Sequence, residues 1–316
     1  MKITEILEKT KNPAYSFEII PPPRGRSISD VIEVVDALMP IRPQWIDVTS
    51  HSSSAYFHEN SDGSIVRKTY RKRPGTLGIC GVIQNRFKVD TVAHVLCLGF
   101  SREETEDALI ELNYLGVQNV LLVRGDSPNY EKKFSKDRSF NFYASDLVRQ
   151  VRDLRDGRFL EELSHSSSLD FCIGVAGYPE KHFEAANLAI DISYLKAKVD
   201  AGADYIVTQM FFDNTRFHEF VAACRKAGIT VPIVPGLKVL KSERQLKSIP
   251  RTFHIDLPSD LAGEILAHPE HCAEISQRWA AQQVRDLHEK GYMNVHFYVM
   301  NDADTVKKVI DLAGGK

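Results

Sequence analysis

The stretch YIVTQMFFDNTRFHEFVAACRKAG, residues 205–228, joins two kinds of pattern. Its first part, residues 205–212, is apolar and rich in β-branched and aromatic residues, which is typical of a buried strand. From Asn214 onward the apolar residues recur at helical spacing, and Gly228 is a common kind of helix stop. The stretch therefore predicts one strand followed directly by one helix.

The same alternation extends in both directions along the chain. The predicted strands span residues 15–20, 44–50, 91–98, 119–125, 170–179, 205–212, 232–237 and 294–300. Several are apolar nearly throughout, as expected for parallel strands that are covered on both faces. Eight strand–helix units without a linker predict an α/β protein with a single (β/α)8 TIM barrel over residues 1–316. A doubly wound open sheet is the alternative fold.

Capping residues mark the helices between these strands. Ser101 and Glu104 have the spacing of a capping box, and the helix that they open is predicted to end at Gly116. Further helices are predicted over residues 186–202 and 271–291, each ending on a glycine. We expect residues 126–141, after the fourth strand, to form an active-site loop, and residues 163–170 a surface loop.

Composition narrows the range of partners and compartments. Forty Lys and Arg residues against 42 Asp and Glu residues argue against nucleic acid as the main partner. The five cysteines form no C-x-x-C pair and are typical of reduced thiols in a cytoplasmic protein. No apolar run approaches the ~18 residues of a membrane span, and the N-terminal segment predicts an amphipathic helix, not a signal peptide. We expect a soluble, cytoplasmic protein without a membrane partner.

The segment VRKTYRKR, residues 66–73, is a strongly basic exception to the balanced charge. Its plain interpretation is a solvated loop or helix flank. A sharper interpretation is a binding site for an anionic tail or phosphate, and nucleic acid is a third.

Glu18 stands in the apolar run YSFEII, which three prolines follow. Alternation along a strand points Tyr15, Phe17 and Ile19 to one side and Glu18 to the other. A carboxylate among the outer helices would be a buried, unpaired charge. At the mouth of the barrel, partial loss of water would raise its pKa and make it a general acid. A Glu paired with an Arg inside the barrel is the structural alternative.

Other strand ends also carry polar side chains, and functional groups of such barrels project from these ends. They include Thr49, His51, His94, Arg124, Asp126, Tyr178, Gln209 and Asn301. His51, His94 and His182 could ligate a metal, but no local spacing such as H-E-x-x-H supports this. Neither common phosphate-binding glycine loop is present, and no G-x-S-x-G elbow supports serine hydrolysis. Lys196 and Lys198 fall in a helix pattern, which counts against a Schiff-base aldolase.

Nine collinear segments resemble the methylenetetrahydrofolate reductase family. They are SFEIIPPP (16–23), VTS (48–50), AHVLC (93–97), VRGDSP (123–128), YASDLV (143–148), GYPEKH (177–182), LKAKVDAGADYIVTQMFFD (195–213), VPGL (234–237) and HFYVMN (296–301). The resemblance covers nearly the whole chain and implies the catalytic barrel alone, without the regulatory region of eukaryotic relatives.

The resemblance implies reduction of 5,10-methylenetetrahydrofolate to 5-methyltetrahydrofolate. Bound FAD would take hydride from NADH or NADPH, with the choice between the two left open, and pass it to the folate. Glu18 would be the general acid that assists opening of the folate's five-membered ring. Asp126 would sit near flavin and pterin, Gln209 would contact folate and nicotinamide, and Gln245 would contact folate. The implied flavin contacts are Thr49, His94, Arg124, Gly125, Asp126, Ala144, Tyr178, His182, Ala185, Asp191 and Lys198.

Three departures from the family pattern affect these assignments. Ser50 to Ser53 replace an aromatic residue or His followed by small residues, and Tyr194 and Ala197 replace an Asn and an Arg that help to bind the dinucleotide. Asp302 replaces an Arg that contributes to folate binding. We take as a hypothesis that the basic run from Arg67 to Arg73 compensates by binding a folate glutamate tail.

Two other functional classes stay open beside the reductase. One is a flavin- or folate-binding barrel that serves as a subunit of a redox complex without its own NAD(P)H activity. The other is a flavin-free barrel lyase or aldolase, against which the absence of a predicted strand-end lysine counts. The family generally forms homo-oligomers, and we expect the same here.

Overall fold

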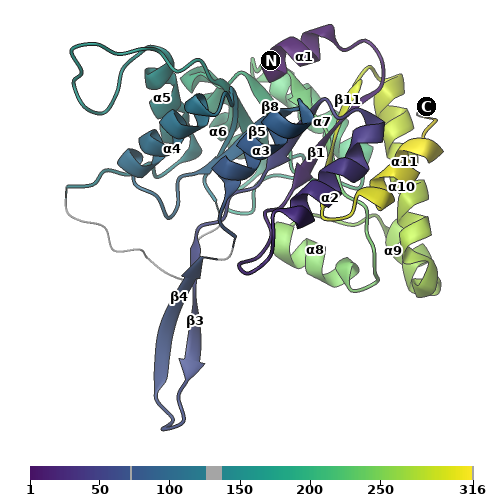
Figure 1. Cartoon of the computed structure of the whole chain (residues 1–316). Helices are drawn as coiled ribbons and strands as arrows, with labels where there is room; N and C mark the ends of the chain where they lie inside the picture. Colours follow the sequence, from purple (N-terminus) through teal and green to yellow (C-terminus); the bar gives the residue numbers. More distant parts are fainter. Residues whose placement is uncertain (72, 126–136, 315–316) are drawn as a thin grey trace.

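The computed structural model describes residues 1–71, 73–125 and 137–314. Its main feature is a parallel sheet that curls into a nearly closed barrel with helices outside it (Figure 1). In spatial order the strands are β10 (Gly236–Leu237), β11 (Asn294–Met300), β1 (Ala14–Ile19), β2 (Trp45–Val48), β5 (Asp90–Leu96), β6 (Asn119–Val123), β7 (Cys172–Gly177), β8 (Tyr205–Thr208) and β9 (Ile233–Val234). The predicted TIM-barrel fold is confirmed, and the open doubly wound sheet is wrong.

The barrel closes through one broken strand. The predicted strand 232–237 divides at Pro235 into β9, which pairs with β8, and β10, which pairs with β11. Proline has no N–H to give to a ladder, but the Pro235 carbonyl accepts a hydrogen bond of 2.9 Å from the His296 N–H. Gly236 permits a close approach here, because a Cβ on it would lie 2.4 Å from the Thr208 carbonyl oxygen.

The helices follow the strands in the predicted order. They are α1 (Ile3–Lys9), α2 (Ser29–Leu38), α3 (Thr76–Phe87), α4 (Arg102–Tyr114), α5 (Ala144–Arg155), α6 (Leu188–Ala201), α7 (Asn214–Lys226), α8 (Gln245–Phe253), α9 (Ser259–Ala267), α10 (Cys272–Glu289) and α11 (Ala303–Leu312), with short 3-10 turns at Met39–Ile41 and Pro269–His271. The predicted capping box of Ser101 and Glu104 opens α4. None of the helices in the described part of the chain has the length and apolar composition that a membrane span requires.

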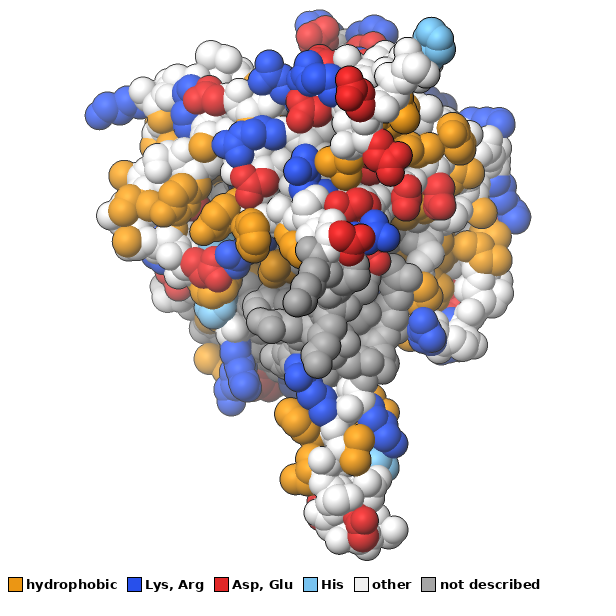
Figure 2. Space-filling model, turned by 90° about the vertical axis from the view of Figure 1, so that its left-hand side faces the viewer, with side chains coloured by type: hydrophobic (Ala, Val, Ile, Leu, Met, Phe, Trp, Pro, Cys, Tyr) orange, Lys and Arg blue, Asp and Glu red, His pale blue; other side chains and the backbone are white. Residues whose placement is uncertain are grey.

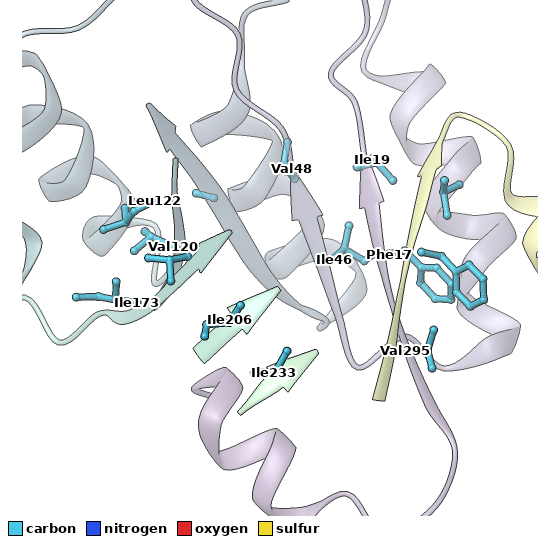
Figure 3. Packing of buried hydrophobic residues seen from close by; sticks show 14 of the residues in the cluster. Phe17, Ile19, Ile46, Val48, Val120, Leu122, Ile173, Ile206, Ile233 and Val295 are labelled. Carbon is cyan, nitrogen blue, oxygen red and sulfur yellow. The ribbon is translucent and has the colours of Figure 1, made fainter. Parts of the chain in front are cut away.

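Two apolar layers hold the barrel together. Side chains that point outward from the strands, such as Phe17, Ile46 and Leu122, pack under the helices (Figure 3). Inside, Trp45 and Tyr205 belong to a second cluster, which also includes Ile3 and Ile6 of α1. Ser16 and Glu18 lie on the inner side of β1, as the alternation predicted, because Tyr15, Phe17 and Ile19 occupy the outer layer.

A β-hairpin projects from the barrel as a narrow arm (Figures 1 and 2). It consists of β3 (Ser53–Glu59) and β4 (Ile65–Arg71), which pair only with each other among the described strands. Phe57 and Ile65 are 73% and 67% exposed on it, and Arg67 and Lys68 are also exposed. The predicted loop or helix flank at 66–73 is therefore wrong for residues 66–71, which form a strand.

Candidate active site

The strand ends surround a cavity of about 590 Å³ at the mouth of the barrel. Its polar lining includes Glu18 on β1, His94 on β5, Gln209 after β8, Lys238 after β10 and Tyr298 on β11. A register shift between β1 and β11 lies beside Glu18, and Met300 in this shift has a left-handed φ of 62°. Such bulges and strained residues are frequent next to functional sites.

Glu18 is a poorly solvated acid in this cavity. Its side chain is 12% exposed, and Oε2 lies 3.6 Å from Nε2 of His94. Burial raises the pKa of Glu18 to about 7, with a smaller rise from Asp47, while His94 and Lys238 lower it. The carboxyl group can therefore hold a proton near neutral pH, as a general acid must.

A buried polar network continues below Glu18. Asp47 is fully buried and accepts hydrogen bonds from Trp45 Nε1 at 2.9 Å and from His94 Nε2 at 3.2 Å. Burial alone would lower the pKa of His94, but the bond to Asp47 and the charges of Glu18 and Asp47 raise it overall. His296 lies 3.9 Å from Asp47, and burial lowers the pKa of His296 to about 4, so this ring is neutral.

Lys238 is a buried cation at the end of β10. The lysine is 8% exposed, and its Nζ donates a hydrogen bond of 2.7 Å to the Tyr298 carbonyl oxygen. Burial lowers the pKa of Lys238 to about 8. The sequence predicted no lysine at a strand end, and this absence counted against an aldolase. That prediction is wrong, because Lys238 follows β10 and lines the cavity.

A side groove of about 450 Å³ continues from the barrel mouth. The two hollows share Val123, Ala176 and Tyr178 as lining residues. In the groove Arg124 pairs with Glu184 at 2.6 Å, and Lys198 Nζ donates a hydrogen bond of 2.5 Å to the Ala176 carbonyl oxygen. Together they form one elongated, partly cationic path that leads away from Glu18.

Every described residue to which the family resemblance gave a catalytic, flavin or folate role lines one of these two hollows, whereas Asn301, named as a polar strand end, lines a separate hollow beside α2. The barrel mouth holds Glu18, Thr49, His94, Gly125, Tyr178, Gln209 and Gln245. The side groove holds Arg124, Ala144, Tyr178, His182, Ala185, Asp191 and Lys198. Asp126 lies outside the described residues, as does most of the predicted active-site loop.

The structure also locates the residues that depart from the family pattern. Ser50, His51 and Ser52 line the barrel mouth, and Tyr194 and Ala197 line the side groove. Asp302 accepts hydrogen bonds from Thr305 at the start of α11 and pairs with Lys241 at 2.7 Å. Burial would raise the pKa of Asp302, but these partners lower it to about 2, so it is a firmly ionised carboxylate.

The sequence analysis did not predict Lys238 or Asp47 as site residues, although each stands in a recognisable sequence pattern. Lys238 directly follows the predicted strand 232–237, so the rule of strand ends could have found it. Asp47 stands in the apolar run WIDV in the same way as Glu18 does in its own strand. Asp47 contacts His94 because β2 and β5 are neighbours in the barrel. The hairpin lies between these two strands along the chain, so the sequence does not show that they are neighbours.

Comparison with known proteins shows that this chain is similar in sequence to several enzymes. Methylenetetrahydrofolate reductase 1 of Schizosaccharomyces pombe is 31% identical over 304 residues, covering 95% of this chain and 46% of the relative. A 5,10-methylenetetrahydrofolate reductase of Pectobacterium carotovorum is 27% identical, covering 92% of this chain and 86% of the relative. The chain thus spans about half the length of the curated eukaryotic relatives that it matches.

Solved structures share the fold. A protein from Clostridium thermocellum, described as binding two copies of 5-methyl-5,6,7,8-tetrahydrofolic acid, superposes with a TM-score of 0.62 at 12% identity, covering 99% of this chain and 98% of that one. At that identity the likeness concerns the barrel alone. The family model of methylenetetrahydrofolate reductase matches residues 2–314, and the chain therefore belongs to the methylenetetrahydrofolate reductase family.

Proposed function

We propose that this chain catalyses the reduction of 5,10-methylenetetrahydrofolate to 5-methyltetrahydrofolate, with FAD as cofactor and NADH or NADPH as reductant. The observation that carries the proposal is the position of Glu18. An acid with a pKa of about 7 lines the same cavity as Thr49, His94 and Gln209, and that cavity leads into a cationic groove. Family membership supports the same reaction.

The residues present fit a flavin dinucleotide. Thr49 Oγ1 at the barrel mouth is buried and has no hydrogen-bond partner among the described residues, so a ligand can supply one. In the side groove, Arg124, His182 and Lys198 would hold the pyrophosphate and ribose, while Tyr194 would lie against the adenine end. Burial lowers the pKa of Lys198 to about 8, so the amine is still mostly charged at pH 7. When bound, the flavin would carry hydride between nicotinamide and folate.

The chain itself would supply one proton and the orientation of the substrate. The O–H bond of Glu18 would break as an N–H bond forms on the folate bridge, and a C–N bond of the five-membered ring would open to give an electrophilic iminium carbon. His94 and the buried Asp47 behind it would hold the Glu18 carboxyl in place. Gln209 and Gln245 would position the folate, and Asp126 would hydrogen-bond the pterin.

One assay tests the proposal. Purified protein should be yellow, and its flavin absorbance should be bleached by NADH or NADPH and restored by 5,10-methylenetetrahydrofolate. Running the half-reaction with both nicotinamides also decides the preferred reductant. A colourless protein that binds no added FAD would overturn the proposal.

The second candidate is a flavin- or folate-binding barrel that works as a subunit of a redox complex. The exposed apolar side chains of the hairpin, such as Phe57 and Ile65, favour a partner surface of some kind. A yellow protein that neither nicotinamide bleaches would support this candidate.

Two further properties belong to the proposal. We propose a cytoplasmic location, because the five cysteines are all buried free thiols, as expected in a reducing compartment. We also propose a homo-oligomer, which sedimentation of the purified protein can test.

A further inference from the structure

Lys238 is a buried charge for which the described chain provides no carboxylate partner. An ammonium group has three N–H donors, and among the described residues only the neutral Tyr298 carbonyl accepts from this one. A buried cation without a counter-charge is costly to a fold. The pKa of Lys238 is about 8 after burial and neighbouring Lys241 lower it, so the amine is still mostly charged at pH 7.

The acids that raise the pKa of Lys238 are already engaged. Asp302 is paired with Lys241 at 2.7 Å and also accepts the Thr305 hydroxyl hydrogen bond of 2.6 Å. Glu18 lies 3.6 Å from His94, and its own pKa of about 7 leaves it only partly ionised at neutral pH. The cavity therefore keeps a positive charge that a bound anion can neutralise.

The residues around Lys238 show where in the site its positive charge lies. Lys238 lines the barrel mouth together with Glu18 and Gln209, and the charges of Glu18, Lys241 and Asp302 act on it. Glu18 is 12% exposed inside the cavity, whereas Lys241 is 41% exposed. Lys238 thus shares the cavity with the buried acid Glu18, while the more exposed Lys241 lies outside the cavity lining.

We propose that Lys238 is a substrate-binding residue whose ammonium group binds a carboxylate of the folate glutamyl tail. The inference rests on the proposed function, since it assumes that folate is the substrate. A folate molecule at neutral pH carries its fixed negative charge on the tail carboxylates, while its pterin ring is neutral. With the folate bridge at Glu18, the tail must cross the rest of the cavity to reach solvent, and Lys238 is a cationic residue of the lining of that cavity.

The test compares two ligands that differ in the tail. Binding of 5-methyltetrahydrofolate and of 6-methyltetrahydropterin, which has no tail, is measured by calorimetry on the flavin-loaded wild type and on variants. Lys238→Met should weaken binding of 5-methyltetrahydrofolate about 10- to 100-fold, the range for a hydrogen bond to a charged group. The affinity for the tail-free pterin should not change, and Lys238→Arg should keep most of the discrimination.

Lys247→Met is the matched control. Lys247 is exposed on α8 and does not line the cavity, whereas Gln245, Ser248 and Ile249 of the same helix do. The control should bind both ligands as the wild type does. If Lys238→Met fails to fold, as judged by its melting curve, Lys238→Gln replaces it and decides by the same criterion.

The possible outcomes distinguish a failure of the role of Lys238 from a failure of the proposed function. Equal loss for both ligands, or no loss for either, would overturn the role of Lys238 and leave the proposed function standing. A wild type that binds neither ligand would overturn the proposed function itself.

Discussion

Glu18 Oε2 lies 3.6 Å from His94 Nε2, and His94 in turn contacts the fully buried Asp47 at 3.2 Å. Three strands that are neighbours in the barrel, β1, β2 and β5, supply these side chains. The arrangement sets a weak acid at the floor of an open cavity and fixes it from behind.

Replacing Glu18 by Gln should separate the two half-reactions. Gln keeps the size of the side chain but has no proton to give, and positioned general acids contribute about 10²- to 10⁴-fold to a rate. We expect flavin reduction by NAD(P)H to change little and reduction of methylenetetrahydrofolate to fall by that factor in stopped-flow measurements. Loss of both half-reactions would assign Glu18 a structural role.

The folate half-reaction should depend on pH through Glu18. Its pKa is raised to about 7 by burial, so the protonated form is present below this pH and is lost as pH rises through it. The rate should therefore fall on the alkaline side of about pH 7. His94→Gln removes a positive charge that lowers the pKa of Glu18, so the midpoint should move to higher pH.

The pH–rate profile of the single-turnover folate reaction checks this prediction. The groups that face Glu18 are His94, Asp47 and Lys238, and their charges enter the apparent value. A midpoint that stays in place in His94→Gln, or that moves to lower pH, would contradict the assignment.

Lys198 should contribute to the affinity for FAD. Its Nζ lies in the side groove, and a charge-assisted bond to a phosphate is worth roughly tenfold or more in binding. We expect Lys198→Met to raise the FAD dissociation constant, measured by the quenching of flavin fluorescence. Lys196→Met is the control, since Lys196 pairs with Asp200 on the same helix and does not line the groove. Equal effects of both substitutions would remove Lys198 from the cofactor site.

The hairpin should be dispensable for the stability of the barrel. Its two strands form a separate sheet, and isolated two-stranded ribbons contribute little stability. Replacing residues 54–70 by a short glycine linker should shift the melting temperature by no more than about 2 °C. A larger drop in a thermal scan would mean that the arm packs on the barrel more closely than β3 and β4 indicate.

The C-terminal end of the basic run from Arg67 to Arg73 has a separate test. Arg73 donates a hydrogen bond of 2.6 Å to the Pro21 carbonyl oxygen, which brings it next to the loop after β1, while Lys72 lies outside the described residues. Changing Arg71, Lys72 and Arg73 to Ala should raise KM for a polyglutamylated folate more than KM for the monoglutamate. Equal changes in the two steady-state constants would dismiss a contact with the extended tail.

Local patterns predicted most of the barrel. The strand and helix segments were visible because burial on both faces selects continuous apolar runs, and capping residues such as Ser101 mark helix ends. The inward direction of Glu18 followed from alternation along one strand, which needs no knowledge of the neighbouring strands. Family motifs then supplied the candidate residues, and those that are described line two connected hollows.

The hairpin and the buried network were beyond such reasoning. The segment 66–73 is rich in Lys and Arg, so its composition indicated a solvated loop and not a strand. Its strand forms by pairing with residues 53–59, and local sequence does not show which segments pair. Asp47 and His94 are 47 positions apart, and His296 and Ser16 are 280 apart, so only closure of the barrel brings them together.

The sequence by itself determined the order of the barrel strands and the helices between them, the family and the acid at position 18, because each depends on residues close together along the chain. Tertiary structure alone decided how far water is excluded from Glu18, which charges surround it and that Lys238 faces the same cavity. Those properties are sums over side chains from many strands, and a pKa or an unpaired charge exists only once these side chains share one enclosed space.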